Sequence, residues 1–455
     1  MNSKSVLSSI LKKVLSSSDS RNQNIKNNVL GSFFNKGCNI LLQLLLVPMT
    51  LHYLDANVYG IWLTLSSVVL WLGMFDIGFS LGLKNKLTES IANADYERGK
   101  ELVSTTYVIL LCVFIPLCIL LEFIIPYINW STFLNVSHTY NLEITQVMHV
   151  LVLCVCIQMI VITINTVLAS FQKVALGGFF TVIANFISVI IIYFLTKYTS
   201  PSMLYLSMTI SFVPILIYIV ASLYFYCGKL KMVCPSIKYY RKSLIREIFG
   251  LGIKFFVINV QVIAMYQTTN ILISNISTPH DVTAYNIGYK YISTALMIFS
   301  LMLSPFWPAF TDAFTRKDFP WMNRVFSKLT KLYWGVFLLV VLMVMCSPVV
   351  YKLWVGSSTI VPWSMSISIG IYIIINSWLA IMINLLNGIG SIKLQSIIMI
   401  IGVCFHIPFS LLLGRYIGAI GVVVSMTILS AIYGIIFTKQ LKMILARTAT
   451  GIWLK

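Results

Sequence analysis

The sequence predicts an all-α polytopic membrane protein, with twelve transmembrane helices in two six-helix bundles around a central cavity. Of its 455 residues, 58% are hydrophobic and 10% are charged, whereas a soluble globular protein has about 45–50% apolar and about 25% charged residues. The apolar residues gather in long runs, and most basic residues lie between these runs. This composition excludes a soluble enzyme, a disordered chain and a nucleic-acid-binding protein.

Each apolar run is long enough to cross a bilayer, which takes about 20 predominantly apolar residues in a helix. Backbone groups in lipid have no water to bond to, so these runs must be helices that satisfy their own hydrogen bonds. The twelve runs are residues 29–51, 58–80, 103–126, 146–170, 175–196, 203–227, 248–275, 284–310, 329–349, 363–387, 394–413 and 417–437.

The distribution of basic residues predicts the orientation of the helices. If the N-terminus lies inside, the inner segments hold 25 Lys and Arg residues and the outer segments hold three. Inner loops of membrane proteins carry such an excess of Lys and Arg. We therefore expect a multi-pass protein of the cell (inner) membrane with both termini in the cytoplasm. This topology also accounts for most of the net charge of +19.

A basic cytoplasmic linker divides the predicted helices six and six. The expected parts are an amphipathic cytoplasmic segment (1–28), an N-terminal bundle (29–227), the linker (228–247), a C-terminal bundle (248–437) and a cytoplasmic tail (438–455). Six spans are an even number, so both halves run in the same direction, as in transporters built from parallel repeats.

Short matches at corresponding positions favour a duplication. Lys36 and Gln43 in the first span correspond to Lys254 and Gln261 in the seventh, and each pair is seven residues apart. The segment Asp55–Tyr59 before the second span is echoed by 281–285 before the eighth.

Polar residues recur at helical spacing within several predicted spans, which places them on one face of each helix. Unpartnered polar groups are costly in hydrocarbon, so these faces should line a helix contact or a water-filled cavity. The residues are Ser32, Asn35, Lys36, Asn39 and Gln43 in span 1; Lys254, Gln261 and Thr268 in span 7; Tyr285, Asn286, Tyr289, Lys290, Ser293, Thr294, Ser300 and Ser304 in span 8; and Asn376, Asn384 and Asn387 in span 10.

The intramembrane lysines Lys36, Lys254 and Lys290 suggest an anionic substrate. A lysine in a span usually faces a bundle interior or a cavity, although each of these three lies near enough to a helix end to snorkel to the interface. Their place in polar stripes favours a shared cationic cavity for a phosphate-bearing ligand. The expected binding residues are Lys36, Asn39, Gln43, Lys254, Gln261 and Lys290.

Two acidic residues, Asp76 and Glu122, lie within the predicted spans. Each could be a structural ion pair or cap, or a site for a coupling ion, either sodium or a proton. The nine cysteines show no metal-ligand spacing, so no metal and no cofactor is expected.

The N-terminal residues resemble those of polysaccharide repeat-unit (O-antigen-type) flippases of the multidrug/oligosaccharidyl-lipid/polysaccharide exporter superfamily. The resemblance covers about 60 residues: Asn35-Lys-Gly37, Val47-Pro48, the run from His52 to Trp62, and Trp71 with Phe75–Leu87.

The resemblance implies a flippase, not an enzyme, that carries an undecaprenyl-pyrophosphate-linked oligosaccharide to the outer leaflet by alternating access, for surface polysaccharide biosynthesis. Its partners would be this anionic lipid-linked oligosaccharide and membrane lipids, and association with polysaccharide polymerase machinery stays open. The cavity residues of related lipid II flippases are mostly Arg, whereas the candidates here are Lys, which lacks the bidentate guanidinium.

Two alternatives belong to other functional classes. A cation-coupled multidrug exporter of the same superfamily would place acids in its cavity, whereas three lysines and two acids are found within the spans here. A membrane polymerase or glycosyltransferase would carry a large outer loop rich in titratable groups. The longest outer loop, 127–145, offers only His138 and Glu143.

Overall fold

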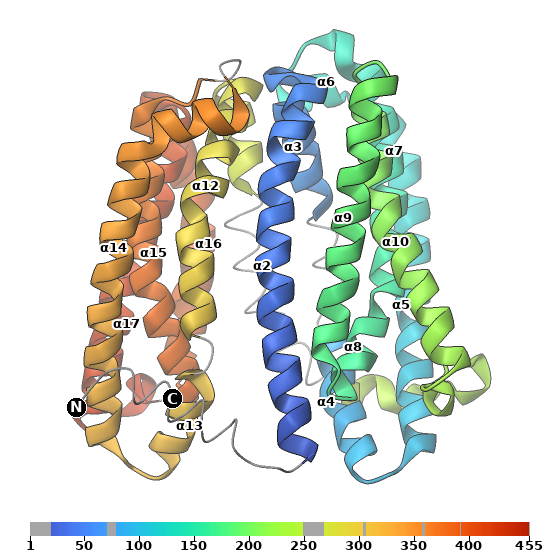
Figure 1. The fold of residues 1–455 in the computed structure, drawn as a ribbon, viewed down its shortest axis with the longest axis vertical. Helices are drawn as coiled ribbons and strands as arrows, with labels where there is room; N and C mark the ends of the chain where they lie inside the picture. Colours follow the sequence, from blue (N-terminus) through green and yellow to red (C-terminus); the bar gives the residue numbers. More distant parts are fainter. Residues whose placement is uncertain are drawn as a thin grey trace. The chain divides into compact units, whose positions relative to one another are not determined.

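The computed structural model describes residues 20–70, 79–248, 268–303, 306–356, 360–391 and 393–454, and every regular element within these ranges is a helix. The predicted amphipathic segment 1–28 lies outside the described residues up to residue 19, and from Ser20 onward it is part of the first helix. Figure 1 shows that, within each of the chain's two compact units, the long helices run side by side.

The first eight described α-helices, in chain order, are α2 (Ser20–Leu54), α3 (Ala56–Leu70), α4 (Phe79–Ala92), α5 (Tyr96–Ile124), α6 (Trp130–Leu134), α7 (Asn141–Val161), α8 (Thr163–Ser170) and α9 (Val174–Tyr198). The others are α10 (Met203–Cys227), α12 (Pro279–Leu303), α13 (Phe306–Thr315), α14 (Phe319–Val355), α15 (Trp363–Ile389), α16 (Lys393–Ile417) and α17 (Ala419–Leu445).

Nine helical segments in the described ranges are long and apolar enough to cross a membrane. Each contains or closely matches one of nine predicted runs. Of the other three runs, 58–80 is described as α3 up to Leu70, and 248–275 lies largely outside the described residues. The run 284–310 corresponds to α12 and α13, and α12 begins at Pro279, earlier than expected.

Two compact units make up the chain. Unit 1 comprises residues 1–49, 72–128 and 145–256, and unit 2 comprises 50–71, 129–144 and 257–455. Two segments of the predicted N-terminal bundle, residues 50–71 and 129–144, thus belong to unit 2 by their contacts. Residues 50–71 cluster in unit 2 because α3 packs on α12, and residues 129–144 do so where the Ser274 hydroxyl donates a 2.7 Å hydrogen bond to the Leu134 carbonyl.

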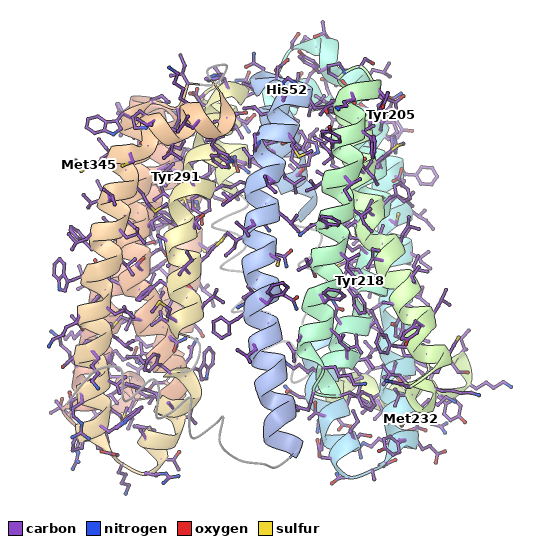
Figure 2. All side chains as sticks on the ribbon, viewed as in Figure 1. His52, Tyr205, Tyr218, Met232, Tyr291 and Met345 are labelled. Carbon is purple, nitrogen blue, oxygen red and sulfur yellow. The ribbon has the colours of Figure 1, made fainter. Side chains whose placement is uncertain are left out.

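Helix α14 has exposed charged residues in its first turns and exposed apolar residues farther along. Its first turns carry exposed Arg324 and Lys328, whereas Leu338 and Met345 expose 66% of their surface farther along the helix; Met345 is labelled on its outer side in Figure 2. Trp334 and Trp354 lie 20 residues apart, about 30 Å along the axis, which is the thickness of a hydrocarbon core. Aromatic rings at such positions are typical of membrane interfaces.

Hydroxyl groups inside the helices bond to their own backbone. Thr64 donates to the Gly60 carbonyl at 3.0 Å and Thr106 donates to the Leu102 carbonyl at 2.9 Å, in both cases one turn back. This bonding satisfies a polar group where no water is present. It explains how the spans hold many Ser and Thr residues at little energetic cost.

The echoed segments at Asp55 and Asp281 both begin a helix. The Asp55 carboxylate accepts hydrogen bonds from the backbone N–H groups of Asn57 and Val58 at 2.8 and 3.0 Å. Thr278 and Asp281 form a reciprocal capping box, in which each side chain accepts from the backbone N–H of the other at 3.3 Å. Both acids satisfy N–H groups that lack a partner within the helix, so the similarity has a local structural reason.

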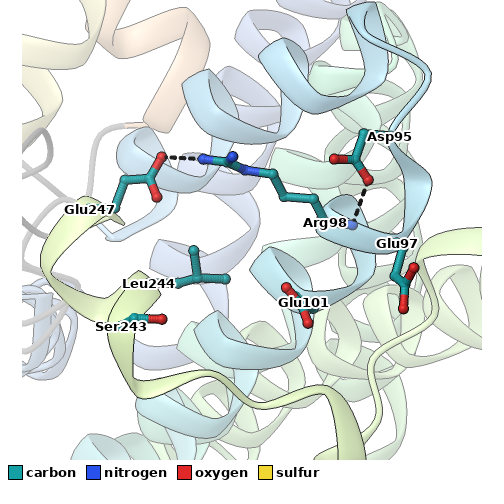
Figure 3. A pocket seen from close by; sticks show the side chains of 7 residues that line it. All are labelled: Asp95, Glu97, Arg98, Glu101, Ser243, Leu244 and Glu247. Carbon is teal, nitrogen blue, oxygen red and sulfur yellow. Dashed lines mark hydrogen bonds and ion pairs between the residues drawn. The ribbon is translucent and has the colours of Figure 1, made fainter.

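The linker docks on α4 and on the start of α5 through polar contacts within unit 1. Arg241 pairs with Glu101 at 2.7 Å, and Glu247 pairs with Arg98 at 2.8 Å and with Lys86 at 3.0 Å. Figure 3 shows the Arg98–Glu247 pair at the edge of a cavity of about 430 Å³.

These ion pairs decide the charge state of Glu247. Burial by itself disfavours the carboxylate, but the hydrogen bonds and charges of Lys86 and Arg98 outweigh it and lower the pKa of Glu247. The same contacts raise the pKa of Lys86, chiefly through its hydrogen bond with Glu247. The charges around this cavity are therefore largely paired with one another, and the cavity lies between the docked linker and the start of α5.

Candidate functional site

The polar face of α2 divides into two parts. Asn35 donates from Nδ2 to the Ala175 carbonyl at 2.7 Å, and Asn39 accepts through Oδ1 a 2.7 Å hydrogen bond from Nδ2 of Asn185. Both partners lie on α9, so these two amides hold α2 against α9. Asn39, which was expected to bind substrate, thus has a helix-packing contact.

Lys36 and Gln43 remain exposed on another side of α2. They are seven residues apart, so they share one face. The exposed apolar residues Phe34, Leu41 and Leu45 (69%, 64% and 53% exposed) lie about 140° or more around the helix from Lys36, since each residue turns the helix by about 100°. The polar strip of Lys36 and Gln43 is therefore separate from the strip formed by these three apolar residues, and Phe33, which is 37% exposed, lies about 60° from Lys36.

In unit 2, α3 and α12 approach each other closely at Gly60. A Cβ atom at this position would lie 1.9 Å from the Pro279 carbonyl oxygen, so only glycine fits without movement of the backbone. Beside it, the Thr283 hydroxyl donates a 2.5 Å hydrogen bond to the Ala56 carbonyl. This contact fixes α3 along the first turns of α12.

A chain of amides follows the same junction. Asn286 donates from Nδ2 to Oδ1 of Asn270 at 2.8 Å, and Asn270 donates to the Ser67 hydroxyl at 2.7 Å. Ser67 completes the chain with a 2.9 Å bond to the Leu63 carbonyl. Three segments of the sequence are thus joined by buried or half-buried polar groups, which are satisfied by one another.

Lys290 lies one turn beyond Asn286 and is half-buried. Its Nζ is 3.5 Å from the hydroxyl of Tyr59, a residue with only 1% of its surface exposed. Tyr285 and Tyr289 stack beside it on α12, with ring centroids 5.6 Å apart. Within the described part of the chain, no carboxylate pairs with Lys290 or with Lys36, so both ammonium groups can accept an anionic ligand.

Members of the predicted stripes of spans 8 and 10 meet farther along α12. Ser300 from α12, and Asn376 and Asn384 from α15, line a cavity of about 240 Å³ together with Trp307 of α13. The expectation that these polar faces line a cavity or a helix contact is met at these three positions.

Comparisons with known proteins bear on what this arrangement is. No protein-family model matches the chain. A curated relative, the putative O-antigen export protein of Yersinia pseudotuberculosis, is 23% identical over 369 residues, which are 78% of this chain and 81% of that protein. A multidrug resistance MATE family transporter of the MOP superfamily, solved in an inward-facing conformation, has a TM-score of 0.74 at 11% identity and covers 91% of this chain and 95% of its own. The chain therefore shares the fold of this transporter.

A second solved structure with a similar fold is the lipid II flippase MurJ in an inward closed conformation. Its TM-score is 0.66 at 14% identity, and the alignment covers 91% of this chain and 87% of that chain. The predicted fold class and the resemblance to polysaccharide flippases are confirmed, and the findings support a multi-pass membrane transporter.

Three of the sequence-predicted site residues, Lys254, Gln261 and Asp76, lie outside the described residues. Glu122 is described on α5, where its carboxylate pairs with His149 of α7. Its second oxygen, Oε1, is buried and has no partner among the described residues.

Sequence reasoning missed Tyr59 and Asn270 as neighbours of the site. Tyr59 belongs to the echoed segment that begins at Asp55, so a signal was present, but nothing in the spacing pointed to Lys290, which is 231 residues away. The predicted span that contains Asn270 has no charged residue within one helical turn of it, so no signal in the sequence pointed to this residue. Its partners, Ser67 and Asn286, lie on α3 and α12.

Proposed function

We propose that this protein is a flippase that moves an undecaprenyl-pyrophosphate-linked oligosaccharide repeat unit from the cytoplasmic to the outer leaflet of the inner membrane, with both termini in the cytoplasm. The observation that carries this proposal is that, among the described residues, no carboxylate forms an ion pair with the ammonium group of Lys36 or of Lys290. A pyrophosphate is the anion that such groups bind through charge-assisted hydrogen bonds.

Each lysine has a local reason to face the substrate path. Lys36 lies on a polar strip with Gln43, away from the apolar strip of the same helix. Lys290 lies eleven residues into α12, about 16 Å along the axis, where an unpaired charge facing lipid would be costly. Lys254 would be the third ligand. The name of the curated relative, an O-antigen export protein, supports a polysaccharide substrate.

The driving force would come from a coupling ion at Asp76 or Glu122. Oε1 of Glu122 is buried without a partner among the described residues, and the other carboxylate oxygen pairs with His149. This site suits a proton better than sodium, because the described surroundings offer no cluster of oxygen ligands. The test is transport into proteoliposomes under an imposed proton or sodium gradient. We expect the proton gradient to drive wild-type transport and Glu122→Gln to lose that stimulation; stimulation by sodium alone would contradict the assignment.

The substrate test uses a strain that lacks the protein and is complemented with variants. Lys36→Glu, Lys254→Glu and Lys290→Glu should each abolish surface polysaccharide and leave lipid-linked repeat units in the inner leaflet at normal protein levels. Lys328→Glu, an exposed lysine of α14, is the matched control and should export normally. Full export by a triple Lys→Gln variant would contradict the proposal.

The multidrug reading stays the second candidate because the MATE transporter shares the fold. It predicts that loss of the protein sensitises cells to cationic drugs while surface polysaccharide is unchanged. Measuring both phenotypes in the same deletion strain separates the two functions.

A further inference from the structure

We infer that the cavity between α12, α13 and α15 is a binding site for one neutral sugar ring. This inference deepens the proposed function and rests on it, since it assigns part of the glycan to a place within unit 2. The cavity has a volume of about 240 Å³, and its lining includes Ser300, Trp307, Asn376 and Asn384.

The polar lining is neutral and incompletely bonded. Asn384 Oδ1 is buried and has no partner among the described residues. Asn376 makes only long bonds of 3.4 Å from Nδ2, to the Tyr372 carbonyl and to the Ser430 hydroxyl. A buried acceptor without a donor is unfavourable, so a ligand hydroxyl or amide that donates to Asn384 would gain the full benefit of that bond.

The charge of the lining distinguishes between classes of ligand. None of the residues that line the cavity, all in the described part of the chain, is charged. A phosphate would need a cation there, and a cationic drug would need an acid or a larger aromatic surface. Hydroxyl and amide groups with both donor and acceptor capacity match the hydroxyl groups of a neutral sugar.

Trp307 supplies an aromatic face, and the packing of α13 fixes its position. A Cβ at Gly388 would lie 2.7 Å from the Trp307 carbonyl oxygen, and the Thr311 hydroxyl donates a 2.7 Å bond to the Gly388 carbonyl. Thr311 and Gly388 therefore hold the first turn of α13 against α15. The Trp307 side chain is 46% exposed, so its ring is accessible to the C–H face of a sugar.

The size of the cavity limits what it holds. Sites for drug-sized molecules have about 300–1,000 Å³, and a water molecule in the liquid takes about 30 Å³. A cavity of about 240 Å³ is therefore suited to a single ring and not to a whole repeat unit. Ser300 lies ten residues beyond Lys290 on α12, about 15 Å along the axis, so one helix can hold a pyrophosphate and a sugar of the same substrate.

The test is saturation-transfer NMR on the full-length protein in lipid nanodiscs, with glucose, galactose, rhamnose and N-acetylglucosamine as separate probes. We expect at least one neutral sugar to give a signal, and Asn384→Leu and Ser300→Ala each to weaken its binding about fivefold, the effect of one neutral hydrogen bond. Trp307→Ala should weaken binding further. Ser300→Ala removes one hydroxyl from an exposed side chain, so it reports on binding even if Asn384→Leu does not fold.

Asn323→Leu and Trp334→Ala on α14 are matched controls, since both side chains are exposed and lie outside the cavity; they should bind sugar like the wild type. No signal from any of the four sugars, or equal signals from wild type and the cavity variants, would overturn the inference. Displacement of the sugar by inorganic pyrophosphate would also overturn it, because it would place the anion in the cavity. The lysine export test is independent of these results, so the sugar site can fail while the proposed function holds.

Discussion

The side-chain amide of Asn286 on α12 donates a 2.8 Å hydrogen bond to the amide oxygen of Asn270. Asn270 is 9% exposed and passes the chain on to Ser67 of α3. The two helices and the segment 268–276 are thus connected through one residue. Substituting Asn270 therefore tests how much these side-chain hydrogen bonds contribute to the stability of a membrane protein.

We expect Asn270→Leu to lower the free energy of unfolding by about 0.5–2 kcal/mol, the range measured for interhelical hydrogen bonds in membranes. Unfolding in mixed detergent micelles, followed by tryptophan fluorescence, would measure it. Asn275→Leu is the control, because Asn275 is exposed and bonds only to its own helix at the Ile271 carbonyl. Equal free energies of unfolding for the two variants would show that the hydrogen bonds of Asn270 do not stabilise the protein.

Gly60→Ala should separate α3 from α12. The added Cβ would meet the Pro279 carbonyl oxygen at 1.9 Å, and overpacking of this kind typically costs about 1–3 kcal/mol. Gly335→Ala on α14 is the control, because nothing lies within 4 Å of its added Cβ; in a helix interior it should be neutral or stabilise by about 0.5–1 kcal/mol. If the thermal unfolding midpoints of the two variants shift by the same amount, the close contact at Gly60 does not require glycine.

The Glu247 ion pairs predict a pH dependence of linker docking. The pKa of Glu247 in the folded protein lies below its ordinary value of 4.5, so the stabilisation is present above that value and is lost as the pH falls through the folded-state pKa. Glu247→Gln should therefore lower the thermal midpoint at about pH 7 and have no effect once the wild-type carboxylate is protonated. The effect should be below about 1 kcal/mol, since these groups are partly exposed.

Glu97→Gln is the matched control for this pH dependence. Glu97 lines the same cavity but forms no ion pair with the described residues. Its charge acts on Arg241 without a hydrogen bond, so its substitution should change the thermal midpoint at about pH 7 by less than Glu247→Gln does. A Glu247→Gln difference that persists at low pH would rule out the ion pairs as its cause.

The Glu122–His149 pair predicts a non-additive mutant cycle. His149→Leu leaves the Glu122 carboxylate without its partner, which is unfavourable within a span. Replacing both residues by Leu removes the charge as well, so the double variant should be more stable than His149→Leu alone. Thermal unfolding of the four members of the cycle measures the coupling, and additive effects would show that the pair is not coupled in solution.

The spans could be predicted well from sequence because each depends on local composition. Runs such as 363–387 and 394–413 correspond closely to α15 and α16, since lipid demands a continuous apolar helix wherever the chain crosses. The polar stripes were also visible. Their division was not, because helical periodicity assigns Asn35, Lys36 and Asn39 to broadly one face and does not say which of them meets α9.

The sequence by itself determined that this chain is a helical membrane protein, where nine described spans lie, and that lysines occur within the predicted apolar runs, because hydrophobicity and charge act locally. Only the tertiary structure decided that Asn39 bonds to Asn185, that Tyr59 lies beside Lys290, and that Ser300 and Asn384 share a cavity. These relationships join residues far apart in the chain, and they depend on close approaches such as the one at Gly60, which no spacing within a single helix encodes.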